Sequence, residues 1–269
     1  MNTPKPKLLI TGAAGRIGCT LVSAFAADYA LHLFDRVPIA EKPADARCIV
    51  ADLSDSAALD RAVDGVGSVI HLAAIPAETP FEDLIEPNIL GTYQLFEAAR
   101  RAGVKRIIYA SSIQAVGFHR LTDGVGQASR IRPSGYYGVT KAFGEALASL
   151  YADKFGISVA CLRIASFEPQ PRDQRQLSTW LSPDDCVRLF RACLEAPDFP
   201  FAVIYGVSAN AASIVRDAVP AAIDYRPRDD AETFRTALAF APASDTATTL
   251  FAGGEYCGWG FVRDFDRVR

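Results

Sequence analysis

The residues of this sequence that are best suited to chemistry are a tyrosine and a lysine four positions apart. Tyr137 and Lys141 fall on one face of a predicted helix, so their side chains point into the same cleft. A lysine cation favours the phenolate form of its neighbour and so lowers a tyrosine pKa that is ordinarily about 10. Ser111 and Ser112 follow a predicted strand and could hold a reacting oxygen. This combination predicts general-base catalysis by Tyr137.

A glycine-rich turn upstream predicts a dinucleotide site. Gly12, Gly15 and Gly18 follow a predicted strand and open a predicted helix, where a backbone without Cβ atoms can approach a pyrophosphate. On its own such a turn is also compatible with a simple tight bend, but Asp35 ends the second predicted strand, where a carboxylate accepts hydrogen bonds from ribose hydroxyls. Asp35 also repels a 2′-phosphate, which predicts NAD rather than NADP. The cofactor residues predicted from these patterns are Gly12, Gly15, Arg16, Ile17, Gly18, Asp35, Asp52, Leu53, Ala73 and Ala74.

Strands and helices alternate through the first 165 residues and must position these groups. The predicted strands are 8–10, 31–34, 48–50, 68–72, 106–110 and 158–162, and the predicted helices are 16–27, 54–63, 84–102 and 137–155. Asp52 or Ser54 is the expected N-cap of the second helix. This order predicts an α/β fold of the Rossmann type, a doubly wound parallel sheet with helices on both faces.

The remaining third of the chain has a different character. A loop leads to a helix that Ser182 should cap and that runs to about Glu195, followed by a strand at 201–205 and a helix at 230–240. We expect residues 1–165 to form an NAD-binding domain, and residues 166–269 a small substrate-binding cap interleaved with it.

Composition narrows the functional classes. The chain has 269 residues, half of them hydrophobic, and a net charge of −3 without a basic stripe, so a nucleic-acid partner is not expected. The six cysteines show neither Cys-x-x-Cys spacing nor a zinc-site pattern, which predicts reduced thiols and no metal site. Neither a signal sequence nor an apolar span of 18 residues is present, so we expect a cytoplasmic protein with no membrane partner. We also expect a homo-oligomer.

Taken in order, these motifs resemble the extended short-chain dehydrogenases/reductases of the NAD-dependent epimerase/dehydratase superfamily. The motifs that carry the resemblance are the turn 11–18, Asp52-Leu53, His71-Leu72-Ala73-Ala74, Asn88-Ile89-Leu90-Gly91-Thr92, Ser111-Ser112 and the run from Tyr137 to Lys141. The resemblance implies that Ser112 is the catalytic serine beside Tyr137 and Lys141. It also implies that Asn88, Tyr137 and Lys141 lie at the cofactor.

A closer resemblance is to the uronate dehydrogenases. It is carried by the segments 132–141, 177–185 and 205–210 and by the short total length. It implies NAD-dependent oxidation of the C1 hydroxyl of a cyclic hexuronate to an aldarolactone, with Ser166 and Arg175 contacting the sugar acid. The planar fork of an arginine suits both oxygens of a carboxylate.

Three positions depart from that family's pattern. Ile113 and Gln114 stand where it has Asn-His after the catalytic serine, and Pro76 stands where it has a serine. The predicted substrate-binding residues are therefore Pro76, Ile113, Gln114, Ser166 and Arg175. Because hydrogen-bonding groups are lost, we expect a small cyclic sugar or sugar acid with fewer or differently placed hydroxyls than glucuronate.

Two other functions fit parts of the same pattern. A nucleotide-sugar epimerase or dehydratase would share the fold, but it needs a larger C-terminal domain, and a dehydratase carries an acidic residue next to the catalytic serine. A non-catalytic NAD-sensing regulator would share the cofactor site, although such a protein usually lacks the tyrosine or the lysine. His71, at the end of a buried strand, is interpreted as a structural histidine.

Overall fold

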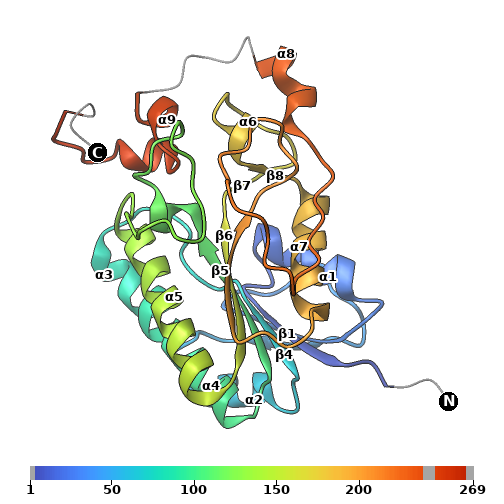
Figure 1. Cartoon of the computed structure of the whole chain (residues 1–269). Helices are drawn as coiled ribbons and strands as arrows, with labels where there is room; N and C mark the ends of the chain where they lie inside the picture. Colours follow the sequence, from blue (N-terminus) through green and yellow to red (C-terminus); the bar gives the residue numbers. More distant parts are fainter. Residues whose placement is uncertain (1–3, 239–245, 265–269) are drawn as a thin grey trace.

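A seven-stranded parallel sheet forms the centre of the computed structural model, which describes residues 4–238 and 246–264 (Figure 1). Its order is β3-β2-β1-β4-β5-β6-β9. Strands β1 to β3 are added toward one edge of the sheet and the later strands toward the other, so the strand order reverses between β1 and β4. This confirms the predicted Rossmann-type fold, in which the reversal opens a crevice at the carboxyl ends of the strands. The strands are β1 (Lys7–Thr11), β2 (Ala30–Asp35), β3 (Arg47–Val50), β4 (Ser68–His71), β5 (Arg106–Ser112), β6 (Ser158–Ile164) and β9 (Phe201–Gly206).

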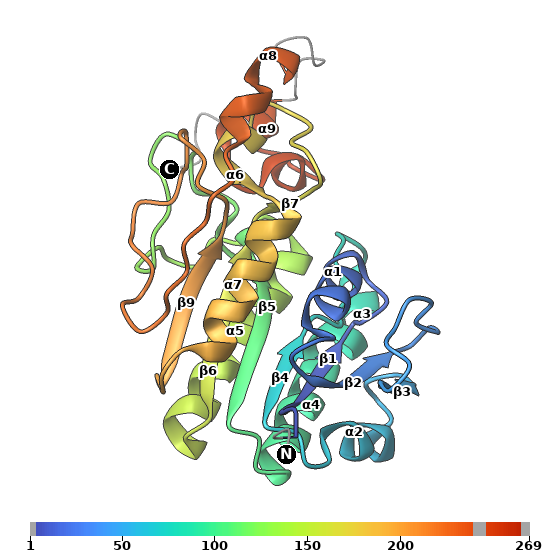
Figure 2. The same ribbon diagram turned by 90° about the vertical axis from the view of Figure 1, so that its right-hand side faces the viewer.

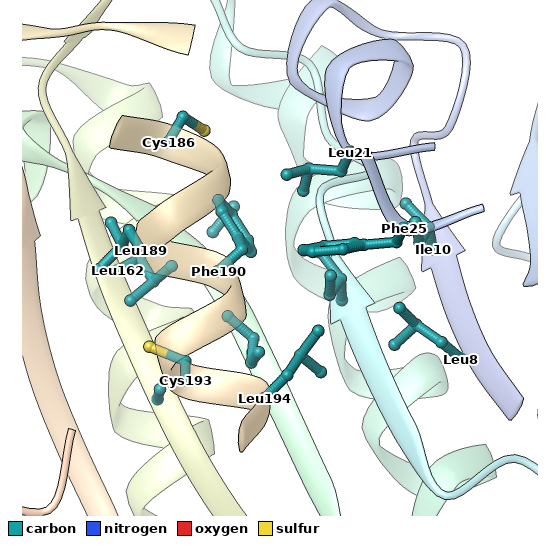
Figure 3. Close-up of a cluster of buried hydrophobic side chains, with 14 of the residues drawn as sticks. Leu8, Ile10, Leu21, Phe25, Leu162, Cys186, Leu189, Phe190, Cys193 and Leu194 are labelled. Carbon is teal, nitrogen blue, oxygen red and sulfur yellow. The ribbon is translucent and has the colours of Figure 1, made fainter. Parts of the chain in front are cut away.

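Helices cover both faces of the sheet. On one face lie α1 (Arg16–Phe25) and α7 (Pro183–Glu195), and on the other α2 (Ser56–Val63), α4 (Gly91–Arg101) and α5 (Tyr136–Phe155) (Figure 2). Side chains alternate between the two faces along each strand. Leu8 and Ile10 therefore enter the first core, under α1 and α7, while Leu9 enters the second core, under α2, α4 and α5. Figure 3 shows α1 and α7 meeting in the first core, where Phe25 and Phe190 point toward each other.

The shorter elements gather beyond the carboxyl ends of the strands, as Figures 1 and 2 show. They are the strands β7 (Ser166–Phe167) and β8 (Trp180–Leu181), the helices α6 (Gln176–Thr179), α8 (Arg235–Leu238) and α9 (Thr246–Leu250), and the single turns η2 (Ile113–Val116), η3 (Ala231–Phe234) and η4 (Gly254–Cys257). Between these elements, α7 and β9 return to the main sheet. No helix in the described part of the chain is long and apolar enough to cross a membrane.

Three predicted elements need correction. The single helix predicted at 84–102 is α3 (Phe81–Leu84), a π-helical turn η1 (Ile85–Leu90) and α4, because Pro87 has no N–H for a regular helix. The N-cap of α2 is Asp55, which accepts from the Ala58 amide at 2.9 Å, whereas Asp52 accepts from Ser54 in the preceding turn. The helix predicted at 230–240 is η3 followed by α8, and residues 239–240 lie outside the described range.

Other predicted caps and contacts agree with the structure. Ser182 caps α7 by accepting from the Asp185 amide at 2.9 Å, and Pro183 takes the first helical position. His71 is buried and bonds Thr11 Oγ1 through Nδ1 at 2.8 Å and Thr92 Oγ1 through Nε2 at 3.3 Å. These bonds make His71 a link between β1, β4 and α4, as expected of a structural histidine.

The burial of His71 makes stability depend on pH. Burial lowers its pKa from 6.5 to about 3, so between these values the unfolded chain binds a proton that the folded chain does not. The free energy of unfolding should therefore fall as the pH falls through this window, by up to about 1.4 kcal/mol per pH unit from this group. Urea unfolding at pH 6.5, 6.0, 5.5 and 5.0 should show a steeper loss for the wild type than for His71→Gln.

A surface histidine provides the control for this experiment. His119→Gln changes a loop residue whose ring bonds the Arg130 carbonyl at 2.9 Å, and it should keep the wild-type slope. If His119→Gln flattened the slope as much as His71→Gln, the pH dependence could not be assigned to His71.

Candidate active site

One pocket of about 670 Å³ collects almost all the predicted site residues at the carboxyl ends of the strands. It contains the glycine turn, the end of β2, the loop after β4, the end of β5 and the first turns of α5. The predicted residues that line it are Gly12, Gly15, Arg16, Ile17, Gly18, Asp35, Asp52, Leu53, Ala73, Ala74, Pro76, Ser112, Gln114, Tyr137, Lys141, Ser166 and Arg175.

The half of the pocket near β1 and β2 fits a dinucleotide. Gly12 has φ +69°, and a Cβ atom there would lie 2.7 Å from the Ala73 amide nitrogen, so the turn requires glycine. The Asp35 carboxylate accepts from the Ala14 amide at 2.9 Å and from the Val37 amide at 3.2 Å, which fixes it beside the glycine turn. A glycine-rich turn, a helix N-terminus and a fixed carboxylate are the groups that hold pyrophosphate and ribose.

The other half contains the predicted catalytic residues. Lys141 Nζ donates to the Ala110 carbonyl at 2.8 Å and lies 5.6 Å from the centre of the Tyr137 ring. Burial lowers the pKa of Lys141 from 10.5 to about 8. The sequence predicted that this lysine would lower the tyrosine pKa, but burial instead raises the pKa of Tyr137, and a hydrogen bond with Ser112 opposes that rise. The expectation was wrong for the chain alone, because both groups are removed from water and the amine is bonded to a carbonyl.

The helix of the predicted catalytic tyrosine is held by a carboxylate that sequence reasoning missed. Glu78, in the loop after β4, accepts from the Tyr136 amide at 2.6 Å and from the Tyr137 amide at 3.0 Å. Gly135, the N-cap of α5, has no side chain for this purpose. Glu78 therefore satisfies the first amides of the helix and joins it to the loop that lines the pocket.

Asn88 has a different place from the one predicted. Its amide donates to the Ile75 carbonyl and to Thr140 Oγ1, both at 3.1 Å, and its side-chain oxygen accepts from the Ile75 amide at 2.8 Å. It is buried and does not belong to the pocket lining. Asn88 thus ties the pocket loop to α5, and its position favours a supporting role over direct contact with the cofactor.

Ile113 also lies away from the pocket. After β5 the chain turns into η2, in which Ser112 Oγ accepts from the Gln114 amide at 3.2 Å. The turn directs Ile113 into a buried cluster with Val116 and Tyr205, so the predicted substrate contact of this side chain is not supported. Gln114 does line the pocket, but its side chain is already bonded within the protein. Nε2 donates to the Gly253 carbonyl at 3.1 Å, and Oε1 accepts from Ser134 Oγ.

Arg175 and Ser166 form a polar part of the pocket lining. Arg175 donates to Ser166 Oγ at 3.1 Å and to the Ala252 carbonyl at 2.9 Å, rather than pairing with Asp173 on the surface. Its Nε is buried without a hydrogen-bond partner among the described residues. Burial also lowers the pKa of this guanidinium from its ordinary value. A buried guanidinium with an unpaired N–H is suited to an anion.

The C-terminal segment adds pocket residues that the sequence did not reveal. Glu255 and Tyr256 line the pocket, and Tyr256 donates from its hydroxyl to the Pro76 carbonyl at 3.5 Å. Gly254 has φ +64°, and a Cβ atom there would lie 2.7 Å from Arg175 Nε. The consecutive glycines Gly253 and Gly254 were the local signal in the sequence that the backbone of this segment packs closely against other residues.

Comparison with known proteins agrees with this geometry. Residues 8–182 match the NAD dependent epimerase/dehydratase family. A uronate dehydrogenase of Pseudomonas syringae pv. tomato is 38% identical over 263 residues, which are 96% of this chain and 96% of that protein. The crystal structure of uronate dehydrogenase from Agrobacterium tumefaciens has a TM-score of 0.90 at 38% identity and covers 94% of this chain and 97% of its own, and a variant of the same enzyme in complex with NAD has the same values.

These findings settle the cofactor and the class of protein. The glycine turn and Asp35 lie as a dinucleotide requires, and the cofactor of this protein is NAD. Its reaction class is oxidoreduction at a CH–OH group. The chain belongs to the NAD dependent epimerase/dehydratase family.

Proposed function

We propose that this protein oxidises the C1 hydroxyl of a small cyclic sugar acid of the uronate class to a lactone. The observation that carries the proposal is the position of Arg175 in the same pocket as Ser112, Tyr137 and Lys141. Its guanidinium, which already donates to Ser166 Oγ, offers a carboxylate site in the same pocket as Tyr137.

In this mechanism Tyr137 is the general base. Its oxygen takes the proton of the C1 hydroxyl, while Ser112 donates a hydrogen bond that orients the reacting oxygen. Bound NAD supplies the acceptor for the hydride that leaves C1. With a pKa of about 8, Lys141 is mostly protonated at neutral pH, and in this mechanism its charge acts against the burial that raises the pKa of Tyr137.

The walls of the pocket set limits on the sugar. Pro76 has no polar side-chain atom, and both polar ends of the Gln114 amide are bonded within the protein. The side of the pocket that would face sugar hydroxyls is therefore poorer in donors and acceptors than the Arg175 side. We expect the preferred sugar acid to carry fewer hydroxyls than glucuronate, or hydroxyls in other positions, since each unmet hydroxyl costs about 1–3 kcal/mol on desolvation.

A substrate panel tests this proposal. Purified protein is given NAD with glucuronate, galacturonate, acids with fewer hydroxyls, and the neutral aldoses glucose and arabinose. NADH absorbance should rise with sugar acids, with kcat/KM above that for neutral aldoses of the same ring size, and the product should be identified as a lactone by mass spectrometry and NMR. Oxidation of neutral aldoses alone would refute the assignment of an acid substrate, and retained cofactor without NADH release would favour an epimerase.

A further inference from the structure

An acidic residue joins two arginines at the rim of the cofactor pocket. Glu168 accepts from Arg16 at 2.6 Å and 3.3 Å through its two carboxylate oxygens, and the oxygen at 2.6 Å also pairs with Arg172 at 2.7 Å. Arg16 and Glu168 both line the pocket. None of the contacts that Glu168 makes is needed by the catalytic mechanism described above.

The two partners come from distant segments of the chain that both line the pocket. Arg16 is the first residue of α1 and belongs to the glycine turn, where the helix N-terminus faces the pyrophosphate position. Glu168 follows β7 and lies 152 positions later, beside the loop that carries Arg175. The ion pair therefore connects the cofactor side of the pocket directly to the substrate side.

The carboxylate is the fixed end of this connection. The Glu168 side chain is only 11% exposed, against 58% for Arg16. The Glu168 carbonyl accepts from Trp180 Nε1 at 2.8 Å, and its amide donates to the Leu181 carbonyl at 3.4 Å. Arg16 is the more exposed partner, and its long side chain extends to the Glu168 carboxylate.

More than one contact holds the Arg16 side chain in place. Arg16 also donates to the Phe167 carbonyl at 3.0 Å, and its guanidinium lies 5.6 Å from the centre of the Phe167 ring. An isolated surface ion pair contributes little, because fixing two long side chains costs entropy. A forked arginine with a buried carboxylate, a carbonyl and a ring is a stronger and more directional arrangement.

We propose that Arg16 and Glu168 form a strap across the bound dinucleotide, and that Glu168 is the positioning residue that holds the strap closed. The cofactor would leave only when the strap opens, so Glu168 would set the rate of NADH release. Two arginines and one glutamate leave a charge of +1 at the rim, which suits a pyrophosphate beneath it. The inference rests on the use of NAD and is independent of which sugar is oxidised.

The test measures cofactor release without turnover. NADH is bound to the purified protein, then displaced by excess NAD in a stopped-flow fluorimeter. Glu168→Gln should release NADH about threefold to tenfold faster than the wild type, the range expected when a partly exposed, forked ion pair is lost. Arg16→Gln should have a similar effect, and the double variant should be little worse than either single one, because both changes remove the same contact.

A second ion pair, which joins α7 to the turn after α1, provides the matched control. Arg191 of α7 bonds Asp28, just after α1, at 2.8 Å, on residues that do not line the pocket. Asp28→Asn removes this link and should leave the NADH release rate unchanged. If Asp28→Asn and Glu168→Gln accelerated release equally, the effect would be general loosening, and the strap would be refuted.

Two further outcomes would also overturn the proposal. Unchanged release in both Glu168→Gln and Arg16→Gln would show that the ion pair does not restrain the cofactor. Slower release and tighter binding in Glu168→Gln would show that the carboxylate competes with the pyrophosphate for Arg16. Added salt should speed release from the wild type more than from Glu168→Gln, which distinguishes the strap from a purely structural role.

Discussion

Replacing Tyr137 with phenylalanine is expected to lower kcat by about 10²–10⁴-fold, the usual contribution of a general base. The substitution removes the oxygen proposed to accept the proton and keeps the ring, which is buried and lines the pocket. Folding and NAD binding should therefore survive. Steady-state rates at saturating NAD and sugar test the first part, and NADH fluorescence titration tests the second.

The neighbouring tyrosine is a matched control for this variant. Tyr136 is 55% exposed and packs against Phe81, so Tyr136→Phe removes a hydroxyl from the same helix turn but not from the pocket. Its turnover should stay close to that of the wild type. Near-normal turnover of Tyr137→Phe, or an equal loss in both variants, would show that Tyr137 is not the base.

Replacing Arg175 with alanine is expected to raise KM for carboxylated sugars by about 10- to 100-fold, since a hydrogen bond to a charged group contributes about 1.5–3 kcal/mol. Neutral sugars should be affected much less, because they place no anion against the guanidinium. The contrast between the two substrate classes is the informative quantity. It is measured as the ratio of KM changes for an acid and a neutral sugar with the same ring.

Arg175→Lys separates charge from geometry. A lysine keeps the positive charge but cannot make the forked contact, so it should recover only part of the affinity for the acid. Because Arg175 also holds Ser166 and the Ala252 carbonyl, the thermal midpoint of each variant should be compared with that of the wild type. Equal KM changes for acidic and neutral sugars would show that Arg175 does not bind a carboxylate.

The parts of this protein that were predictable are those determined by local periodicity. The strand–turn–helix around Gly12, the buried strands and the capped helix after Ser182 each follow from residues close together in the sequence. The Rossmann-type order then follows, because alternating strands and helices allow few connections. These same rules placed Tyr137 and Lys141 in one pocket with the glycine turn.

The parts that were missed depend on contacts between distant loops. Glu78 accepts from two amides, 58 and 59 positions away, and Glu168 pairs with an arginine 152 positions away. Neither contact leaves a periodic pattern in the sequence. Ile113 was placed wrongly because a turn after Ser112, rather than a continued strand, decides where it points. The prediction of a lowered Tyr137 pKa was wrong for a related reason. Burial raises this pKa, and the burial of a side chain depends on the whole fold.

The return of α7 and β9 ties the C-terminal part of the chain to the main sheet. Phe190 of α7 shares a core with Phe25 of α1 and Leu162 of β6, and β9 pairs with β6 along six consecutive positions. A chain cut after residue 165 would expose that apolar face and leave β6 as an unpaired edge, which invites aggregation. We expect the loops of the C-terminal part to diverge in sequence but not to be exchangeable as a detachable module, because α7 packs on the main sheet and β9 belongs to it.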